Sequence, residues 1–171
     1  MGSIRVPAAI AIAVLALDQW TKRWATGALA DRPPMRVLDG VVQFTYTRNP
    51  GVAFGLGAGS HFPYWIFSVV AAIAIVALLV LRPDRPPLKR AALGLVLGGA
   101  VGNLIDRVRF GEVVDFILLS WRHWQFPVFN VADSAVSIGV VIFALSWSSG
   151  GSKSEPLAAP SGAPEPDAAS R

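Results

Sequence analysis

The 171-residue sequence contains no cysteine and only two histidines, His61 and His123. A chain without cysteine has neither disulfide bonds nor a thiolate nucleophile. Catalytic zinc sites ordinarily take three protein ligands, many of them histidine, and no HExxH pair is present here. We therefore expect no metal ion and no other cofactor.

Charge is also scarce, because Asp, Glu, Lys and Arg make up 15% of the chain, whereas a soluble domain is usually about 25% charged. Hydrophobic residues make up 53%, and so much apolar surface on a short chain favours an integral membrane protein. The net charge is +4, but no basic run is interleaved with stacking aromatics, so we expect no nucleic-acid partner. Basic residues that flank membrane spans bind anionic headgroups, and membrane lipid is the predicted environment.

Four apolar stretches are expected to be helical membrane spans, since each approaches the roughly 20 residues that a bilayer requires. The first starts with the apolar run 6–17. No small-residue cleavage site follows it, so we expect an uncleaved span. The others are expected at 62–81, 91–107 and 126–147. The third contains Gly94, Gly98 and Gly102 at four-residue spacing, a pattern that permits close approach of a neighbouring helix.

The segments between these spans predict a topology. Residues 31–59 place proline and glycine around the β-branched and aromatic stretch 41–47, which predicts a strand or hairpin. Because open strand edges cannot cross a bilayer, this segment should form a small sheet on the membrane surface. The basic, proline-broken loop 82–90 should be cytoplasmic under the positive-inside rule, together with both termini. Residues 31–59 and a second surface segment, 108–125, then face outward.

The predicted fold class is thus membrane all-α, with four transmembrane helices and a small extramembrane β element on the outer face. This domain is expected to span residues 1–148. Residues 149–171 are mostly Gly, Ser, Pro and Ala with scattered charge. That composition is typical of a disordered tail.

Polar residues stand at the ends of the apolar stretches, where ionisable groups are costly and usually functional. They are Asp18 and Lys22, four apart; Asn103, Asp106 and Arg107; Asn130 and Asp133, three apart; and Asp115, in an apolar setting. Plain structural alternatives exist. Asp18 with Lys22 is then only an intrahelical ion pair. Asp106 with Arg107 marks a helix end at the interface, and Asn130 only caps the last helix.

Asp115 and Asp133 lie in apolar sequence, and neither has a cation within four residues. Two carboxylates in close approach predict acid–base hydrolysis, because both cannot ionise easily. The ionised carboxylate takes a proton from a water that attacks a peptide carbonyl. The protonated one stabilises the developing oxyanion. Such a pair titrates as a unit, and the sequence assigns the proton to neither residue.

Five sequence blocks resemble the lipoprotein signal peptidase (signal peptidase II) family, whose members are membrane aspartyl proteases. The blocks follow one another in order from the first expected span to the fourth, so the resemblance does not depend on a single short motif. They are LDQWTK at 17–22, TRNPGVAFG at 47–55, GNLIDR at 102–107, VVDF at 113–116 and FNVADS at 129–134.

The resemblance implies roles for individual residues. The family's catalytic aspartates lie in the VVDF and FNxAD blocks, which implies Asp115 and Asp133 here. The remaining motif residues are then supporting or substrate-binding, and they are Asp18, Lys22, Asn49, Asn103, Asp106, Arg107 and Asn130.

The resemblance also implies a substrate and a location. The family's substrate is a bacterial prolipoprotein whose cysteine already carries diacylglycerol, and the enzyme cuts just before that cysteine. We expect a monomer in the inner membrane, with its active site toward the periplasm. A lipid-bearing cysteine can stay in the bilayer and enter such a site sideways between spans.

Three alternatives remain open. A Ser–Lys dyad would pair Lys22 with a serine. A proton-coupled transporter would use intramembrane aspartates as a relay, and a scaffold protein would leave the carboxylates without a role. Removing both carboxyl charges separates these classes, because a scaffold would survive and a Ser–Lys enzyme would still cut. The candidate serines are Ser60, Ser68, Ser120, Ser134 and Ser137.

Overall fold

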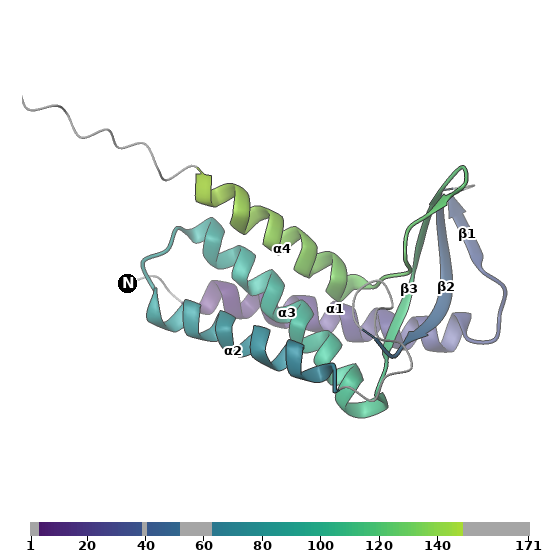
Figure 1. Cartoon of the computed structure of the whole chain (residues 1–171), viewed down its shortest axis with the longest axis horizontal. Helices are drawn as coiled ribbons and strands as arrows, with labels where there is room; N and C mark the ends of the chain where they lie inside the picture. The colour runs from purple at the N-terminus through teal and green to yellow at the C-terminus, as the bar shows by residue number, and fades with distance from the viewer. Residues whose placement is uncertain (1–3, 39–40, 52–62, 149–171) are drawn as a thin grey trace, which may run out of the picture.

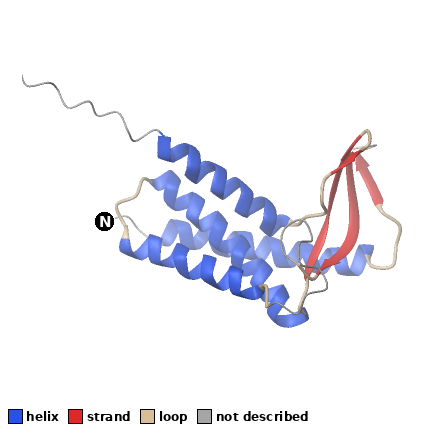
Figure 2. Cartoon of the chain, viewed as in Figure 1, coloured by secondary structure: helices blue, strands red, loops and turns tan. Residues whose placement is uncertain are grey.

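A computed structural model describes residues 4–38, 41–51 and 63–148. Figure 1 shows the helices bundled side by side with a sheet at one end, and Figure 2 shows that helices and strands are segregated. The expected tail and part of segment 31–59 lie outside the described residues. The helices are α1 (Arg5–Leu29), α2 (Trp65–Leu81), α3 (Pro87–Phe110) and α4 (Val131–Ser148), and the strands are β1 (Met35–Leu38), β2 (Val42–Asn49), β3 (Val113–Trp121) and β4 (Trp124–Gln125).

α3 is the central helix, because it packs against each of the other three helices. Its glycines make this possible. Gly94 and Gly98 lie against α1, where a Cβ atom added to Gly94 would approach the carbonyl oxygen of Pro7 to 2.6 Å. Gly99 of α3 and Gly139 of α4 lie equally close to the facing helix across the α3–α4 contact. The predicted close approach at small residues is therefore confirmed.

Among the described residues, only α3 has both the length and the apolar composition of a membrane span. The other helices fall short for separate reasons. α2 has 17 residues and rises about 26 Å, slightly less than the roughly 30 Å hydrocarbon core. α4 is likewise a shorter apolar helix. α1 has 25 residues, but its second half carries Asp18, Lys22 and Arg23. Four spans therefore remain a prediction.

The strands form one antiparallel sheet in the order β1-β2-β3-β4. The hairpin expected within 31–59 is confirmed as β1 and β2. The second surface segment, for which no strand was predicted, adds β3 and β4 to this sheet. β3 pairs with β2 and sets Thr47 opposite Asp115 and Asn49 opposite Val113. This pairing places a polar residue of β2 next to the aspartate of β3.

An aromatic cluster fixes the C-terminal end of α1 to the sheet. The ring of Trp24 meets Phe44 of β2 and Phe116 of β3 edge-to-face, with centroid separations of 5.4 and 6.2 Å. Ala25 and Leu29 are buried against the same rings. Edge-to-face pairs are a preferred aromatic geometry, so this cluster sets the position of β3 relative to α1.

Two helix starts differ from the prediction. α3 begins at Pro87, inside the expected loop 82–90, because proline at the first helical position lacks only an N–H with no intrahelical partner. α4 begins at Val131 instead of 126. Before it, Phe129 exchanges backbone hydrogen bonds with Ile117 of β3, at 2.8 and 3.0 Å. Pro127 also disfavours a helical conformation at the residue before it. Segment 126–130 therefore follows the sheet.

Candidate active site

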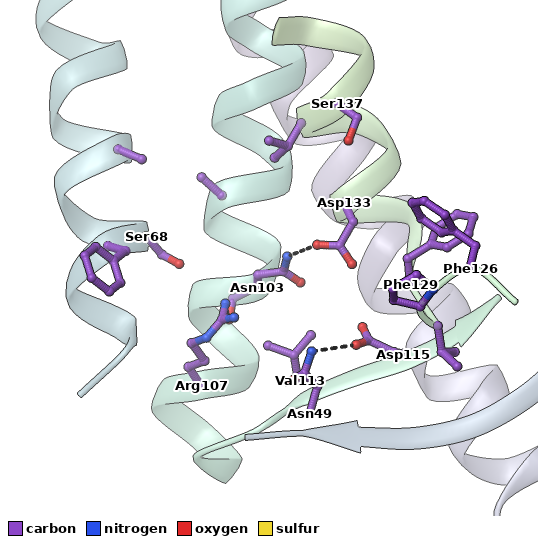
Figure 3. A pocket seen from close by; sticks show the side chains of 16 residues that line it. Asn49, Ser68, Asn103, Arg107, Val113, Asp115, Phe126, Phe129, Asp133 and Ser137 are labelled. Carbon is purple, nitrogen blue, oxygen red and sulfur yellow. Dashed lines mark hydrogen bonds between the residues drawn. The ribbon is translucent and has the colours of Figure 1, made fainter. Parts of the chain in front are cut away.

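A cavity of about 420 Å³ lies where α2, α3 and α4 meet the sheet. Figure 3 shows Asp115 of β3 and Asp133 of α4 projecting toward it from two elements. Asn103 and Arg107 of α3 and Asn49 of β2 add further polar groups to its lining. The cavity thus gathers five of the nine residues singled out from the sequence.

Asn130 begins α4 and also positions Asp133. The Asp133 N–H donates to Asn130 Oδ1 at 2.9 Å, and the Asn130 N–H donates to Asp133 Oδ2 at 3.2 Å. This reciprocal pair is a capping box. The N–H of Ala132 donates to Asp18 Oδ1 at 3.0 Å, so α1 satisfies another amide of the buried helix start. Asn130 therefore does cap the last helix, as the structural alternative predicted.

The same Asn130 side chain also contacts the second aspartate. Its Nδ2 donates to Asp115 Oδ1 at 2.7 Å. Asn49 Nδ2 donates to Asp115 Oδ2 at 3.1 Å, while Asn49 Oδ1 accepts the N–H of Gly51 at 3.0 Å. Since each amide oxygen already accepts a backbone N–H, the nitrogen is the end that faces Asp115. Both oxygens of Asp115 therefore accept an amide hydrogen.

Lys22 orients a third amide, that of Asn103. Its Nζ lies 2.9 Å from Asp18 Oδ2 and 2.9 Å from Asp106 Oδ2, and it donates to Asn103 Oδ1 at 2.9 Å. Three acceptors match the three hydrogens of the ammonium group. Asn103 Nδ2 then donates to Asp133 Oδ1 at 2.8 Å. The predicted intrahelical ion pair between Asp18 and Lys22 is therefore present. Lys22 is also connected through Asn103 to Asp133 of the cavity.

Asp106 and Arg107 do not form a simple helix end at an interface. Asp106 is 2% exposed and accepts hydrogen bonds from the Val114 N–H at 3.3 Å and from Gln19 Nε2 at 3.0 Å. Arg107 lines the cavity and donates from Nη2 to the carbonyl of Gly51 at 3.1 Å. Its Nε is buried and has no acceptor among the described residues. Arg107 is therefore a cavity-lining cation that is held by the backbone of Gly51.

The Ser–Lys alternative has no geometric support in the described part of the chain. The hydrogens of Lys22 point to two carboxylates and one amide oxygen. Ser68 and Ser137 line the cavity, but neither is a partner of Lys22. The Ser134 hydroxyl donates to the carbonyl of Asn130, and Ser60 lies outside the described residues.

Burial, with the neighbouring carboxylate of Asp133 as a second cause, raises the pKa of Asp115 to about 6. Hydrogen bonds from Asn49 and Asn130 act in the opposite direction, because they stabilise the ionised form. A carboxyl group with such a pKa is available as an acid or as a base close to neutral pH. The pair can therefore carry acid–base chemistry.

Sequence analysis missed Gln19 and most of the cavity wall. Gln19 could have been predicted to be a site residue, because it lies inside the LDQWTK block. Pro127 was the signal that the segment before α4 is not helical. Part of the missed wall comes from α2 and segment 126–129: Phe67, Ala71, Phe126, Pro127, Val128 and Phe129.

Comparison with known proteins relates these features to a family. The family model described as signal peptidase (SPase) II matches residues 10–148. Lipoprotein signal peptidases of Syntrophotalea carbinolica and Symbiobacterium thermophilum are 41% and 43% identical, covering 88% and 77% of this chain and 96% and 86% of theirs. A solved bacterial membrane enzyme is 32% identical, with a TM-score of 0.78 over 91% of this chain and 96% of that one. Since the family model spans most of the sequence and the fold is that of a membrane enzyme, the chain belongs to the signal peptidase II family.

Proposed function

We propose that this protein is an aspartic endopeptidase that removes the signal peptide from diacylglyceryl-modified prolipoproteins, cutting just before the lipidated cysteine. One observation carries the aspartic mechanism. Asp115 and Asp133 line one cavity, and Asn130 contacts both carboxylates, at 2.7 and 3.2 Å. The substrate class is supported by the relatives named lipoprotein signal peptidase.

In the proposed mechanism one carboxyl group of the pair is ionised and the other is protonated. The ionised group takes a proton from water while the water oxygen attacks the peptide carbonyl carbon. The protonated group gives its proton to the carbonyl oxygen, which yields a neutral tetrahedral diol. The first group then returns its proton to the leaving nitrogen as the C–N bond breaks, and the second takes a diol proton. No covalent enzyme intermediate forms.

The remaining residues position substrate and carboxylates. We assign Arg107 to the substrate backbone, because its side chain lines the cavity together with Asp115 and Asp133. Asn49 supports Asp115, and Asn103 supports Asp133. The apolar wall from α2 and segment 126–129 suits a lipid-bearing cysteine that enters from the bilayer. Asp18, Lys22, Asp106 and Asn130 hold these groups in place.

The proposed arrangement has four helices crossing the bacterial inner membrane as a monomeric domain over residues 1–148, with a dispensable tail at 149–171. The start of α1, the α2–α3 loop and the end of α4 lie together, opposite the sheet (Figure 1). This end carries Arg82 and Arg85 in the loop and Lys89 and Arg90 in the first turn of α3, which favours the cytoplasm. The sheet and the cavity are then on the periplasmic side.

The test is cleavage of a diacylated model prolipoprotein by the wild type, Asp115→Asn and Asp133→Asn. We expect each variant to insert and fold but to lose turnover, because an amide neither takes a proton from water nor donates one to the carbonyl oxygen. Ser137→Ala, which alters the same cavity, serves as the control and should keep its activity. Near-normal turnover by either Asn variant would disprove the aspartic mechanism.

A further inference from the structure

We propose that the protein has a second binding site, for one anionic phospholipid, at the end of the bundle opposite the active-site cavity. The α2–α3 loop forms its headgroup part, and the outward face of α2 forms its acyl part. The proposal rests on the membrane arrangement given above. It does not depend on the chemistry of the aspartates.

The headgroup part is a cavity of about 790 Å³. Arg82, Arg85 and Lys89 line it, against the single carboxylate of Asp84. Among the described residues, Arg82 and Arg85 form no ion pair with a carboxylate. The Arg85 guanidinium lies 5.4 Å from the ring centroid of Phe143, a contact that holds the loop against α4. The excess of positive charge matches a phosphate diester.

A buried arginine contacts the same loop, although it does not line the cavity. Arg90 is 4% exposed and donates from Nη1 to the carbonyl of Pro83, but its Nη2 has no partner among the described residues. A buried cation without a counter-ion is costly. In addition, Pro86 caps α3 without any side-chain hydrogen bond, so the positive end of this long helix faces the same loop. An anion bound in the cavity would face this helix end, and its charge would also be attracted by Arg90 nearby.

The acyl part is an apolar groove of about 490 Å³ along α2. Leu81 lines both this groove and the basic cavity, so the two adjoin at this residue. From Ala72 to Leu81 the helix rises about 13 Å, enough for a long stretch of an acyl chain. A soluble anion would use only the basic cavity, whereas a phospholipid fills both parts. The groove is lined by Ala72, Ile73, Val76, Ala77, Val80 and Leu81.

The site has a structural consequence for α2. This helix packs on α3 through Ile75, Leu79 and Leu93, and its other end contributes Phe67 and Ser68 to the wall of the active-site cavity. A lipid that bridges the loop and the groove would bind α2 and the start of α3 together. We therefore expect it to raise the thermal stability of the bundle.

The experiment measures binding of phosphatidylglycerol to the purified full chain in detergent, by native mass spectrometry and thermal unfolding. The wild type should retain one phosphatidylglycerol and unfold at a higher temperature with it, and phosphatidylcholine should do neither. The double variant Arg82→Gln/Arg85→Gln should bind about 30-fold more weakly, given the contribution of each basic residue at a membrane surface. The matched control Arg32→Gln/Arg36→Gln loses the same charge near the sheet and should bind like the wild type.

Two further arms test the acyl part. Glycerol phosphate, which has no acyl chain, should not stabilise the wild type, and Ala77→Trp should fill the groove and weaken phosphatidylglycerol binding. Wild-type affinity in the double arginine variant, or equal stabilisation by glycerol phosphate, would overturn the proposal. Peptide cleavage is not the readout, so failure here is distinguishable from failure of the proposed peptidase function.

Discussion

At the scale of single residues, the Asp115 carboxyl group gives a prediction for pH. Its pKa is raised to about 6 by burial and by Asp133, so it is protonated below that pH and ionises above it. The proposed mechanism needs one protonated carboxyl group, and ionisation of Asp115 removes a proton from the pair. We therefore expect kcat/KM, which reports on the free enzyme, to fall as pH rises above about 6. A profile that is flat from pH 5 to 9 would contradict the requirement for one protonated carboxyl group.

Lys22 gives a prediction for stability. Lys22→Met leaves Asp18 and Asp106 buried without their cation, and such a loss typically costs about 3–5 kcal/mol of unfolding free energy. The amide of Asn103 also loses the donor that orients it, so we expect kcat to fall in the protein that still folds. Chemical unfolding and steady-state kinetics measure the two effects.

Arg23→Met is the matched control, because this neighbouring cation is exposed and forms no ion pair among the described residues. A surface substitution of this kind usually changes stability by less than about 0.5 kcal/mol. Equal losses in the two variants would show that the buried cluster is not what stabilises the protein here.

The sequence predicts which polar residues matter better than it predicts what they touch. Asp18 and Lys22 stand four apart, so their ion pair could be anticipated. The bond from the Ala132 N–H to Asp18 joins residues 114 positions apart, and no local pattern encodes such a contact. The sequence likewise identified Asn49, Asn103 and Asn130 as candidate site residues. It did not predict how their amides are oriented, because that depends on donors from Lys22 and from the backbone.

At the scale of elements, replacement of a helical glycine by alanine should have opposite effects at a packed and at an open position. Gly99→Ala places a Cβ within 2.8 Å of Val136 and even closer to the Ala132 carbonyl oxygen, so the helices must separate, at about 1–3 kcal/mol. Gly27→Ala in α1 meets nothing within 4 Å and should stabilise by up to about 1 kcal/mol. Unfolding of both variants in one detergent measures the difference. Destabilisation at Gly27 as large as at Gly99 would contradict the packing argument.

Elements with strong local patterns were predictable, and those fixed by distant partners were not. The apolar run of α2 and the hairpin of β1 and β2 are local features. β3, in contrast, depends on pairing with β2, as in Thr47 opposite Asp115, and its own sequence is simply apolar. The start of α4 was misplaced for the same reason, because Phe129 bonds to Ile117 of the sheet.

At the scale of the whole molecule, the proposed position of the cavity at the membrane interface predicts strong dependence on the substrate's lipid. An unlipidated peptide must bring polar backbone to the membrane interface without compensation. Each buried CH₂ of a diacylglyceryl group contributes about 0.8 kcal/mol, and the acyl chains also fix the depth of the cysteine. We expect kcat/KM to be more than about a hundredfold higher for the diacylated substrate in the same detergent.

A control substrate carries the diacyl group on a cysteine three residues earlier in the peptide. It has the same hydrophobicity but sets the scissile bond at a different depth, so it should be cleaved slowly. If lipidated, shifted and unlipidated substrates were cut equally well, the enzyme would be a general peptidase that does not recognise lipid.

The reciprocal hydrogen bonds between Asn130 and Asp133 have one more consequence. These bonds cap the start of α4, and the side chain of Asn130 also donates to Asp115. Terminal turns open more readily than the centre of a packed bundle. One unwound turn at Val131 would release Asp133, and Asp115 would lose the amide of Asn130 in the same event. Under the proposed aspartic mechanism, heat would therefore inactivate the protein by fraying a single helix end, while the rest of the bundle was still folded.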